Sequence, residues 1–569
     1  MKYSRICFFL LLLCALCGSS FAVDRTAFTF TNYDLEVRID PEGHAIAARG
    51  KVRLRNDSSA AQKNLTLQIS SSLTWRLIEL NGKALTYAAE PYTTDIDHTG
   101  AVTEAAVALP SAVPPKGTLE LEVGYAGEIV PDTTRLTRIG MPAETAAHSD
   151  WDQVGEPVTA VRGIGYVAWY PVSLPAASLS DSSLFAALDD WKRSQHDTNM
   201  RVTLCWVGEN ELTTVANGRG EGVSRHALGA GEDATTAMGC SVYSFAPVAT
   251  TVPAFALAEY TALTRPAINV YHLPPQGPAA QEYALAAEKV LPFAREWFGA
   301  PNAKVQVVQL PDLGDVPFES GPLLFTPLEL IDRNAIQARM MHQVAHASLN
   351  SPRPWIDEGV AHFAQALERE RESGRTAALT YMRSFLPALQ AAEAGVATRA
   401  TSSLINSTDE VMHRVKAMYV WWMLRDMVGD VALQQAFKKY RAPDDKDPAY
   451  MPHLIEQAAK RDLEWFFDDW VYRDRGLPDF RLESVFPRTT LNGTQVVTVT
   501  VANDGDAAAE VPVFARAEGG ERTKRMLVKG KSKAVERVEM PTLPNEAVVN
   551  DGSVPESNMD NNAMAVAPK

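Results

Sequence analysis

The sequence lacks several features that would each assign it to a class. No stretch after residue 22 reaches the roughly 20 consecutive apolar residues of a membrane-spanning helix, so we expect no span in the mature chain. Basic residues are not in excess, since 54 Lys and Arg stand against 69 Asp and Glu, a net charge of −15. Nucleic acids and anionic lipids are bound through basic patches, so neither is an expected partner. We also find no internal repeat, which argues against repeat architectures.

Cysteine is scarce in the part of the chain that would fold. Residues 1–22 have the form of a secretory signal peptide, with two basic residues, an apolar run and a small-x-small cleavage site. We therefore expect a secreted or periplasmic protein. Three of the five cysteines leave with this leader. The remaining two, Cys205 and Cys240, lie in strand-like segments, and an oxidising compartment predicts a disulfide between them; two buried thiols are the alternative.

The pattern of apolar residues divides the rest of the chain into three parts. A chain of 569 residues is too long for one hydrophobic core, because cores stop growing near about 250–300 residues. Alternation with turn residues over 23–265 predicts an amino-terminal antiparallel β-sandwich or saddle. Helical spacing over 266–485 predicts a mostly α domain after an initial α+β portion. Alternation returns over 486–569 and predicts an immunoglobulin-like β-sandwich, so the expected class is multidomain α+β.

The strongest chemical signal is His342-Gln343-Val344-Ala345-His346, inside an apolar helical run. Residues four apart lie on one face of a helix, so both imidazoles can reach a single ion. Glu358 follows a turn broken by proline, at the start of the next helix, and adds a carboxylate. Two imidazoles and one carboxylate are a common catalytic zinc set, with the fourth position left for water or substrate. We therefore predict Zn²⁺ held by His342, His346 and Glu358.

With these motifs the sequence resembles the gluzincin metallopeptidases, and among them the membrane alanyl aminopeptidase family, whose zinc helix carries His-Glu-x-x-His. The segment Pro317-Phe318-Glu319-Ser320-Gly321 is similar to a degenerate form of that family's Glu-containing exopeptidase loop. Residues 416–430 and 463–470 resemble its later helices. The resemblance implies a thermolysin-like catalytic domain over 266–485, zinc as cofactor, and a peptide or protein substrate.

The resemblance also implies catalytic roles, and two of the positions depart from the family's pattern. Gln343 replaces the Glu that takes a proton from water; a neutral amide can orient water but cannot accept that proton, and loss of a general base costs about 10²–10⁴-fold in rate. The family's transition-state tyrosine precedes a Lys-Gly pair, whereas here Arg414 and Val415 precede Lys416. Tyr419 is the nearby candidate substitute, with hydrophobic packing as the alternative.

Glu319 would bind the amino terminus of the substrate, and an exposed loop Glu is the alternative. His413 is a further candidate donor to an oxyanion. Asp357 could orient a ligand imidazole or simply favour the start of its helix, and His362 is expected beside the ligands and not among them.

Two functions follow from these residues. The first is a secreted zinc peptidase of aminopeptidase type with weak or altered activity. The second is a catalytically inactive homologue that binds a peptide or acts as a scaffold in the cell envelope, which Gln343 and the missing tyrosine favour. The sequence carries no signal for an oligomeric state.

Overall fold

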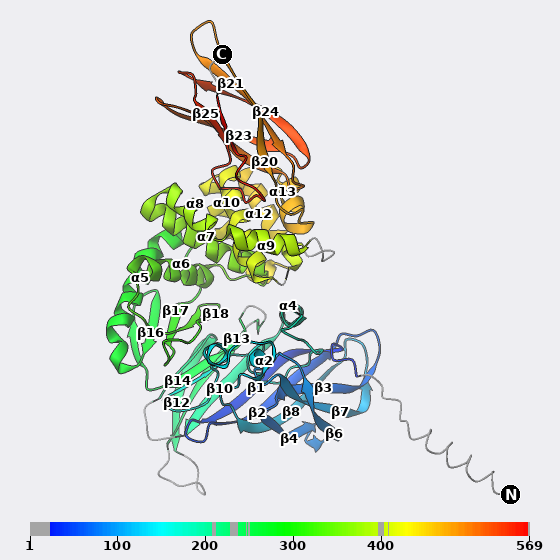
Figure 1. The fold of residues 1–569 in the computed structure, drawn as a ribbon. Coiled ribbons are helices and arrows are strands. Elements are labelled where there is room, and N and C mark those ends of the chain that lie inside the picture. Colours follow the sequence, from blue (N-terminus) through cyan, green and yellow to red (C-terminus); the bar gives the residue numbers. More distant parts are fainter. Residues whose placement is uncertain are drawn as a thin grey trace, which may run out of the picture. The chain divides into compact units, whose positions relative to one another are not determined.

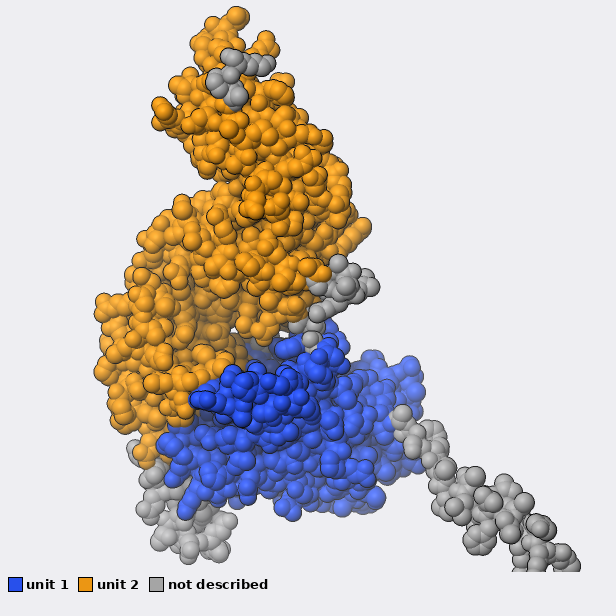
Figure 2. All heavy atoms as spheres, viewed as in Figure 1, with its two compact units in different colours: residues 1–210, 218–255 blue, residues 211–217, 256–569 orange. Residues whose placement is uncertain are grey.

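The computed structural model describes residues 23–181, 183–207, 212–227, 237–245, 247–248, 251–396, 403–407 and 409–566. The predicted leader, residues 1–22, lies outside them. The described chain is a mixed α/β structure of several sheets and many helices, which confirms the expected class at this level (Figure 1). It divides into two compact units, residues 1–210 with 218–255 and residues 211–217 with 256–569, coloured separately in Figure 2. In the described chain we find no helix with the length and hydrophobicity that a bilayer crossing requires.

The first unit is built on two sheets, with strand orders β12-β13-β10-β1-β2-β8-β4-β5 and β3-β7-β6. Neighbouring strands are antiparallel except for β1 and β10. Alternate residues of β1, such as Tyr33, Leu35 and Val37, are fully buried, as a period of two requires. The elements of this unit are β1 (Phe28–Asp40), β2 (Ala45–Asn56), β3 (Gln62–Ser70), β4 (Leu73–Leu80), β5 (Lys83–Ala84), β6 (Tyr87–Thr93), β7 (Ala101–Val113), β8 (Thr118–Glu128), α2 (Thr134–Arg138), α3 (Ala143–Ser149), β9 (Val158–Val161), α4 (Ser183–Ser194), β10 (Asn199–Val207), β12 (Arg219–Ala227) and β13 (Ala237–Phe245).

A disulfide joins Cys205 on β10 to Cys240 on β13. The two residues are directly opposite each other in the antiparallel ladder, and both are nearly fully buried. The predicted pairing is therefore confirmed.

The first unit also buries a network of ion pairs. Arg135 donates from Nε and Nη2 to the two carboxylate oxygens of Asp150, at 2.8 and 2.7 Å. Arg162 donates from Nε to Asp152 at 2.9 Å, and all four side chains are at most 3% exposed. Buried guanidinium and carboxylate groups are tolerated when each is paired in this way.

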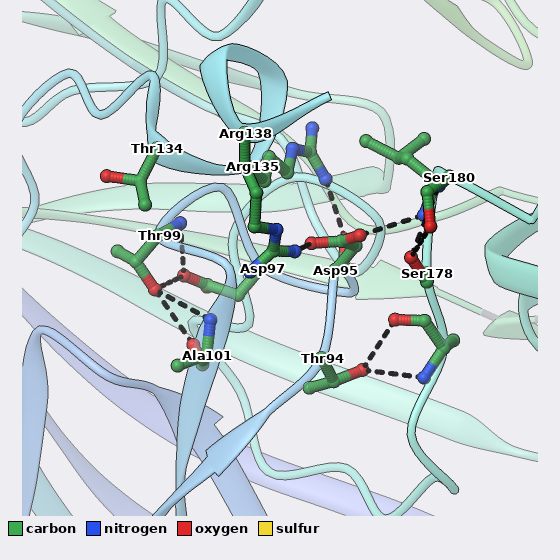
Figure 3. A network of polar contacts seen from close by, with 12 residues as sticks. Thr94, Asp95, Asp97, Thr99, Ala101, Thr134, Arg135, Arg138, Ser178 and Ser180 are labelled. Atoms are coloured by element: carbon green, nitrogen blue, oxygen red, sulfur yellow. Dashed lines mark hydrogen bonds and ion pairs between the residues drawn. The ribbon is translucent and has the colours of Figure 1, made fainter. Parts of the chain in front are cut away.

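Hydrogen bonds and ion pairs of the same network hold the loop between β6 and β7 in place, as Figure 3 shows. Arg138 pairs with the carboxylate of Asp95, and Arg135 donates to the backbone carbonyl of Asp95 at 2.8 Å. The carboxylate of Asp97 accepts a hydrogen bond from the hydroxyl of Thr99 at 2.8 Å. Each of these acidic side chains therefore has a donor inside the unit.

The second unit begins with a five-stranded sheet of order β15-β16-β17-β19-β18. Its strands β16 (Ile268–His272), β17 (Val305–Gln309) and β19 (Leu323–Thr326) are parallel, and helix α5 (Gly277–Phe298) connects the first two. The edge strand β18 (Phe318–Ser320) runs antiparallel to β19. Helix α6 (Arg333–Ser348) follows β19 and packs against α5 and against α7 (Pro354–Ser373).

The rest of the second unit is helical and then returns to strands. The carboxy-terminal strands form two sheets, β20-β21-β24 and β23-β22-β25-β26, whose inner residues belong to the same hydrophobic core as the helices. The remaining elements are β11 (Thr213–Ala216), β14 (Phe255–Ala258), β15 (Thr261–Thr264), α8 (Arg375–Arg383), α9 (Leu386–Val396), the π-helix η4 (Met412–Lys416), α10 (Ala417–Val428), α11 (Asp430–Lys439), α12 (Tyr450–Ala459), α13 (Glu464–Phe467), the π-helix η6 (Asp468–Tyr472), β20 (Phe480–Thr489), β21 (Gln495–Asn503), β22 (Ala509–Ala517), β23 (Gly520–Val528), β24 (Ser532–Met540), β25 (Glu546–Val549) and β26 (Ala563–Ala565), with short 3₁₀ turns at Pro274–Gln276, Leu404–Asn406 and Ala442–Asp444.

Candidate metal centre

Helix α6 holds the two predicted histidine ligands in a fixed position. The carboxylate of Asp332 caps the helix by accepting hydrogen bonds from two backbone N–H groups of the first turn. Almost every residue from Ile336 onward is buried; His342 is 5% exposed and His346 4% exposed. A helix packed on all sides leaves little freedom to either imidazole ring.

Helix α7 places Glu358 beside these rings. The helix begins at Pro354, a residue well suited to the first helical position. Gly359 allows close approach to α10, because a Cβ atom at this position would lie 2.5 Å from the Cβ of Ala417. The indole of Trp355 stacks on that of Trp421 with ring centroids 5.1 Å apart. These contacts fix the first turns of α7, from which Glu358 projects.

Three atoms from α6 and β18 converge on one point. The Nε2 atoms of His342 and His346 are 3.1 Å apart, and Oε2 of Glu319 lies 2.8 Å from the first and 3.9 Å from the second. Three atoms with these separations lie on a circle of radius about 2.0 Å, which equals the length of zinc bonds to imidazole nitrogen and carboxylate oxygen, about 2.0–2.2 Å. Glu319, His342 and His346 therefore form one of the groups of side chains that could hold a metal ion.

Glu358 and two neighbours complete the cluster. Oε1 of Glu358 lies 4.0 Å from Nε2 of His346, and Oε2 lies 4.0 Å from Nε2 of His362. Oδ2 of Asp357 lies 3.4 Å from Nδ1 of His346, on the side of the ring away from Nε2. Glu358 thus belongs to two groups of possible metal ligands, one with His342 and His362 and one with His346 and Asp357.

The electrostatics of the cluster are dominated by its carboxylates. Burial opposes a charge on His346, but Asp357, Glu358 and Glu319 outweigh it and raise the pKa of this imidazole to about 9. Burial likewise opposes ionisation of Glu319, yet His342 and His346 hold the pKa of its carboxyl well below the usual range. Burial, with His342 nearby, lowers the pKa of His362 to about 3. The carboxylates of the site therefore favour positive charge. His362 is neutral, so its imidazole nitrogen is available as a possible metal ligand.

The structure places the predicted catalytic residues in different surroundings. Gln343 is fully buried on α6, and within the described chain neither atom of its amide has a hydrogen-bond partner. Tyr419 is 1% exposed in α10 and belongs to the hydrophobic core, and no described contact joins it to the histidine cluster. His413 is buried, and its Nε2 donates to the carbonyl of Ser407 at 2.5 Å.

Sequence reasoning missed the position of Arg414. This residue lies in the π-helix η4, with its Nε 3.5 Å from Oε2 of Glu358 and its Nη1 3.2 Å from Glu410. Two residues further on, the fully buried Lys416 pairs with Glu393 and Asp474 and so anchors this turn. One signal in the sequence could have placed Arg414 near Glu358. Arg414 lies shortly before Lys416, and the resemblance implies that a tyrosine of the active site precedes this lysine.

Comparison with known proteins gives a fold and no family. No protein-family model matches the chain, and no curated protein matches it. Among solved structures, Legionella pneumophila aminopeptidase A in complex with aspartic acid is similar over 94% of this chain, with a TM-score of 0.63 and 12% sequence identity. The chain spans 60% of that protein's length. The likeness shows that this chain shares its fold with part of that protein.

Proposed function

We propose that this protein is a secreted, zinc-dependent hydrolase of peptides in which His342, His346 and Glu358 hold the ion. The observation that carries the proposal is the convergence of two buried imidazole Nε2 atoms with carboxylates from β18 and α7. The fold shared with an aminopeptidase supports the same conclusion. The proposal includes an amino-terminal β domain over 23–265, a thermolysin-like domain over 266–485 and an immunoglobulin-like domain over 486–569.

The chain's own residues define what such a site can do. A bound zinc ion would supply Lewis acidity, which activates water and polarises a peptide carbonyl. His346 must be neutral to bind it, and Asp357 is placed to hold the ring by its Nδ1 side. Gln343 can orient a water molecule but cannot accept its proton, so we expect turnover about 10²–10⁴-fold slower than with a glutamate there.

A second candidate function follows from the same residue. A protein that binds zinc and peptides without cutting them needs no general base and no transition-state donor. The neutral amide of Gln343 and the burial of Tyr419 in the core favour this alternative.

One experiment separates the two. The mature protein would be analysed for zinc by elemental analysis and assayed for release of amines from amino-acid amides, beside a Gln343→Glu variant. Stoichiometric zinc with slow release that the variant accelerates about 10²-fold or more would support the hydrolase. Stoichiometric zinc without turnover in either protein would leave the binding function, and absence of zinc would refute the assignment of His342, His346 and Glu358 as ligands.

A further inference from the structure

We infer that Tyr440 and Asp445 are positioning residues of the metal centre. They act through Asp357, which lies beside the ring of the ligand His346. The inference rests on the proposed zinc site and adds to it a set of side chains that lie outside the ligands. It follows from a series of buried hydrogen bonds that starts at the connection between α6 and α7.

The connection between α6 and α7 is short, because Glu358 follows His346 by only 12 positions. Within this connection, the backbone N–H of Ser351 donates to Oδ1 of Asp357 at 3.0 Å. The other carboxylate oxygen, Oδ2, lies 3.4 Å from Nδ1 of His346. The position of Ser351 therefore determines which way the carboxylate of Asp357 faces.

The side chain of Ser351 is held in turn by Tyr440, the residue that follows the last turn of α11. The hydroxyl oxygens of these two residues lie 2.8 Å apart, and Oγ of Ser351 also accepts a hydrogen bond from the backbone N–H of Arg353 at 3.1 Å. Ser351 and Tyr440 are each 5% exposed. Burial, with Asp445 nearby, raises the pKa of the Tyr440 phenol well above its usual range, so the phenol keeps its proton and can donate.

Asp445 closes this series of contacts into a ring. Its Oδ2 accepts a hydrogen bond from the phenol of Tyr440 at 2.7 Å, and its Oδ1 accepts one from Nε of Arg353 at 2.7 Å. The side chain of Asp445 is fully buried. It keeps one orientation, since turning it would break both bonds and leave a buried charge without partners. The ring therefore ties the connection between the two ligand helices to the turn that follows α11.

The effect of this ring on the metal ion passes through Asp357. Among the described residues, Asp357 belongs to a group of possible metal ligands and Asp445 belongs to none. A carboxylate on the far nitrogen of a ligand imidazole orients the ring and raises its basicity. At 3.4 Å the contact between Asp357 and His346 is longer than an ordinary hydrogen bond, so a small shift of Ser351 would be enough to lose it.

The test compares the zinc affinity of the mature protein with that of Tyr440→Phe and of Asp445→Asn, by competition with a chromophoric chelator. We expect each variant to bind zinc about 10-fold more weakly, at the lower end of the range for partners of ligand rings. The visible absorption of the cobalt-loaded protein should shift in Tyr440→Phe in the same way as in Asp357→Asn. Tyr260→Phe is the matched control, because it removes a buried hydroxyl that donates to the backbone carbonyl of Gln309 at 3.0 Å in the same unit. It should leave the zinc affinity and the spectrum unchanged.

A double variant shows whether the ring acts through Asp357. The zinc affinity of Tyr440→Phe combined with Asp357→Asn should equal that of Asp357→Asn alone, because the charge that the ring positions is already absent. A further loss of about 10-fold in the double variant would mean that Tyr440 acts by another route, and it would overturn the inference.

The outcomes separate this inference from the proposed function. A wild type that binds no zinc would refute the assignment of the zinc ligands, on which the inference rests. If the wild type binds zinc and Tyr440→Phe binds it equally well with an unchanged cobalt spectrum, only the role of Tyr440 and Asp445 is overturned. An equal loss of affinity in Tyr260→Phe would also overturn that role, because the loss would then come from stability and not from the position of Asp357.

Discussion

The two units each bury a cluster of charged side chains, and the clusters differ in whether the protein itself satisfies them. In the first unit Arg135 and Arg162 face Asp150 and Asp152, and donors and acceptors match at hydrogen-bond distance. In the second unit two imidazole nitrogens face each other at 3.1 Å beside several carboxylates. Burial and charge alone therefore do not identify a functional site. Imidazole nitrogens and carboxylate oxygens that approach one common position are instead an arrangement that could hold a metal ion.

The largest expected effect on stability comes from removing one partner of an ion pair in the first cluster. Replacing Arg135 with Met removes the guanidinium and leaves Asp150 buried without its partner, so we expect the first unit to lose about 3–5 kcal/mol of unfolding free energy. Hydrogen exchange of the β1 and β2 amides in a urea series measures this loss. Arg193→Met, at an exposed ion pair with Asp190, is the control and should leave the exchange unchanged. A loss below about 1 kcal/mol for Arg135→Met would show that the network is not required.

Removing the metal should affect only the second cluster. With free zinc about 1,000-fold above its dissociation constant, binding stabilises the folded state by about 4 kcal/mol, and a chelator removes that contribution. We expect faster hydrogen exchange in α6 and α7 after chelation and no change in β1 or β2. Equal protection with and without chelator would mean that the second cluster, like the first, is satisfied by the protein alone.

A pH series on chelated protein tests the charge balance of the second cluster. The pKa of His346 is raised to about 9 from an ordinary value of 6.5, so its protonation favours the folded state. This contribution, at most about 3 kcal/mol, is fully present below pH 6.5 and is lost as the pH rises through 9. Unfolding by urea can be followed by the helical circular dichroism signal, which comes mainly from the second unit. The urea concentration at the midpoint should therefore fall as the pH rises from 6.5 through 9. With zinc bound the imidazole is neutral at every pH tested, and a similar fall there would contradict the assignment.

Local patterns were enough to predict the parts of the site that lie close together in the sequence. The spacing of His342 and His346 puts both rings on one helical face, and the turn before α7 brings Glu358 next to them. The pairing of Cys205 with Cys240 followed from composition, since only two cysteines remain outside the leader. Each of these predictions needed only residue type and periodicity.

Contacts between distant segments could not be predicted in the same way. The distance from Glu319 to His342 depends on the pairing of β18 with β19 and on the packing of α6, neither of which periodicity specifies. The ion pairs of the first unit join residues 15 and 10 positions apart across the short elements α2, α3 and β9, which have too few residues to show a repeating pattern. Tyr419 lies in an apolar helix, where a catalytic and a packing tyrosine have the same sequence context.

Asp357 gives the smallest expected effect, because it belongs to one of the groups of possible metal ligands and also, like the acids of the first unit, has a donor within the protein. Its Oδ1 accepts a hydrogen bond from the backbone N–H of Ser351 at 3.0 Å, while Oδ2 lies 3.4 Å from Nδ1 of His346. Asp357→Asn keeps the shape but removes the charge that orients the imidazole, so zinc affinity should fall about 10–100-fold. Competition with a chromophoric zinc chelator measures it.

The matched control for that substitution is Asp332→Asn at the cap of α6. Asparagine caps helices about as well as aspartate, so this variant should keep both the helix and the zinc affinity of the wild type. If the two variants lost zinc equally, the effect would come from general charge and not from the contact with His346. If only Asp357→Asn lost zinc affinity, the acids around the histidines would have two different roles. Some would bind the ion, whereas Asp357 would hold the ring of a ligand histidine in place. The ion pairs of the first unit, which are complete within the protein, have no such division of roles.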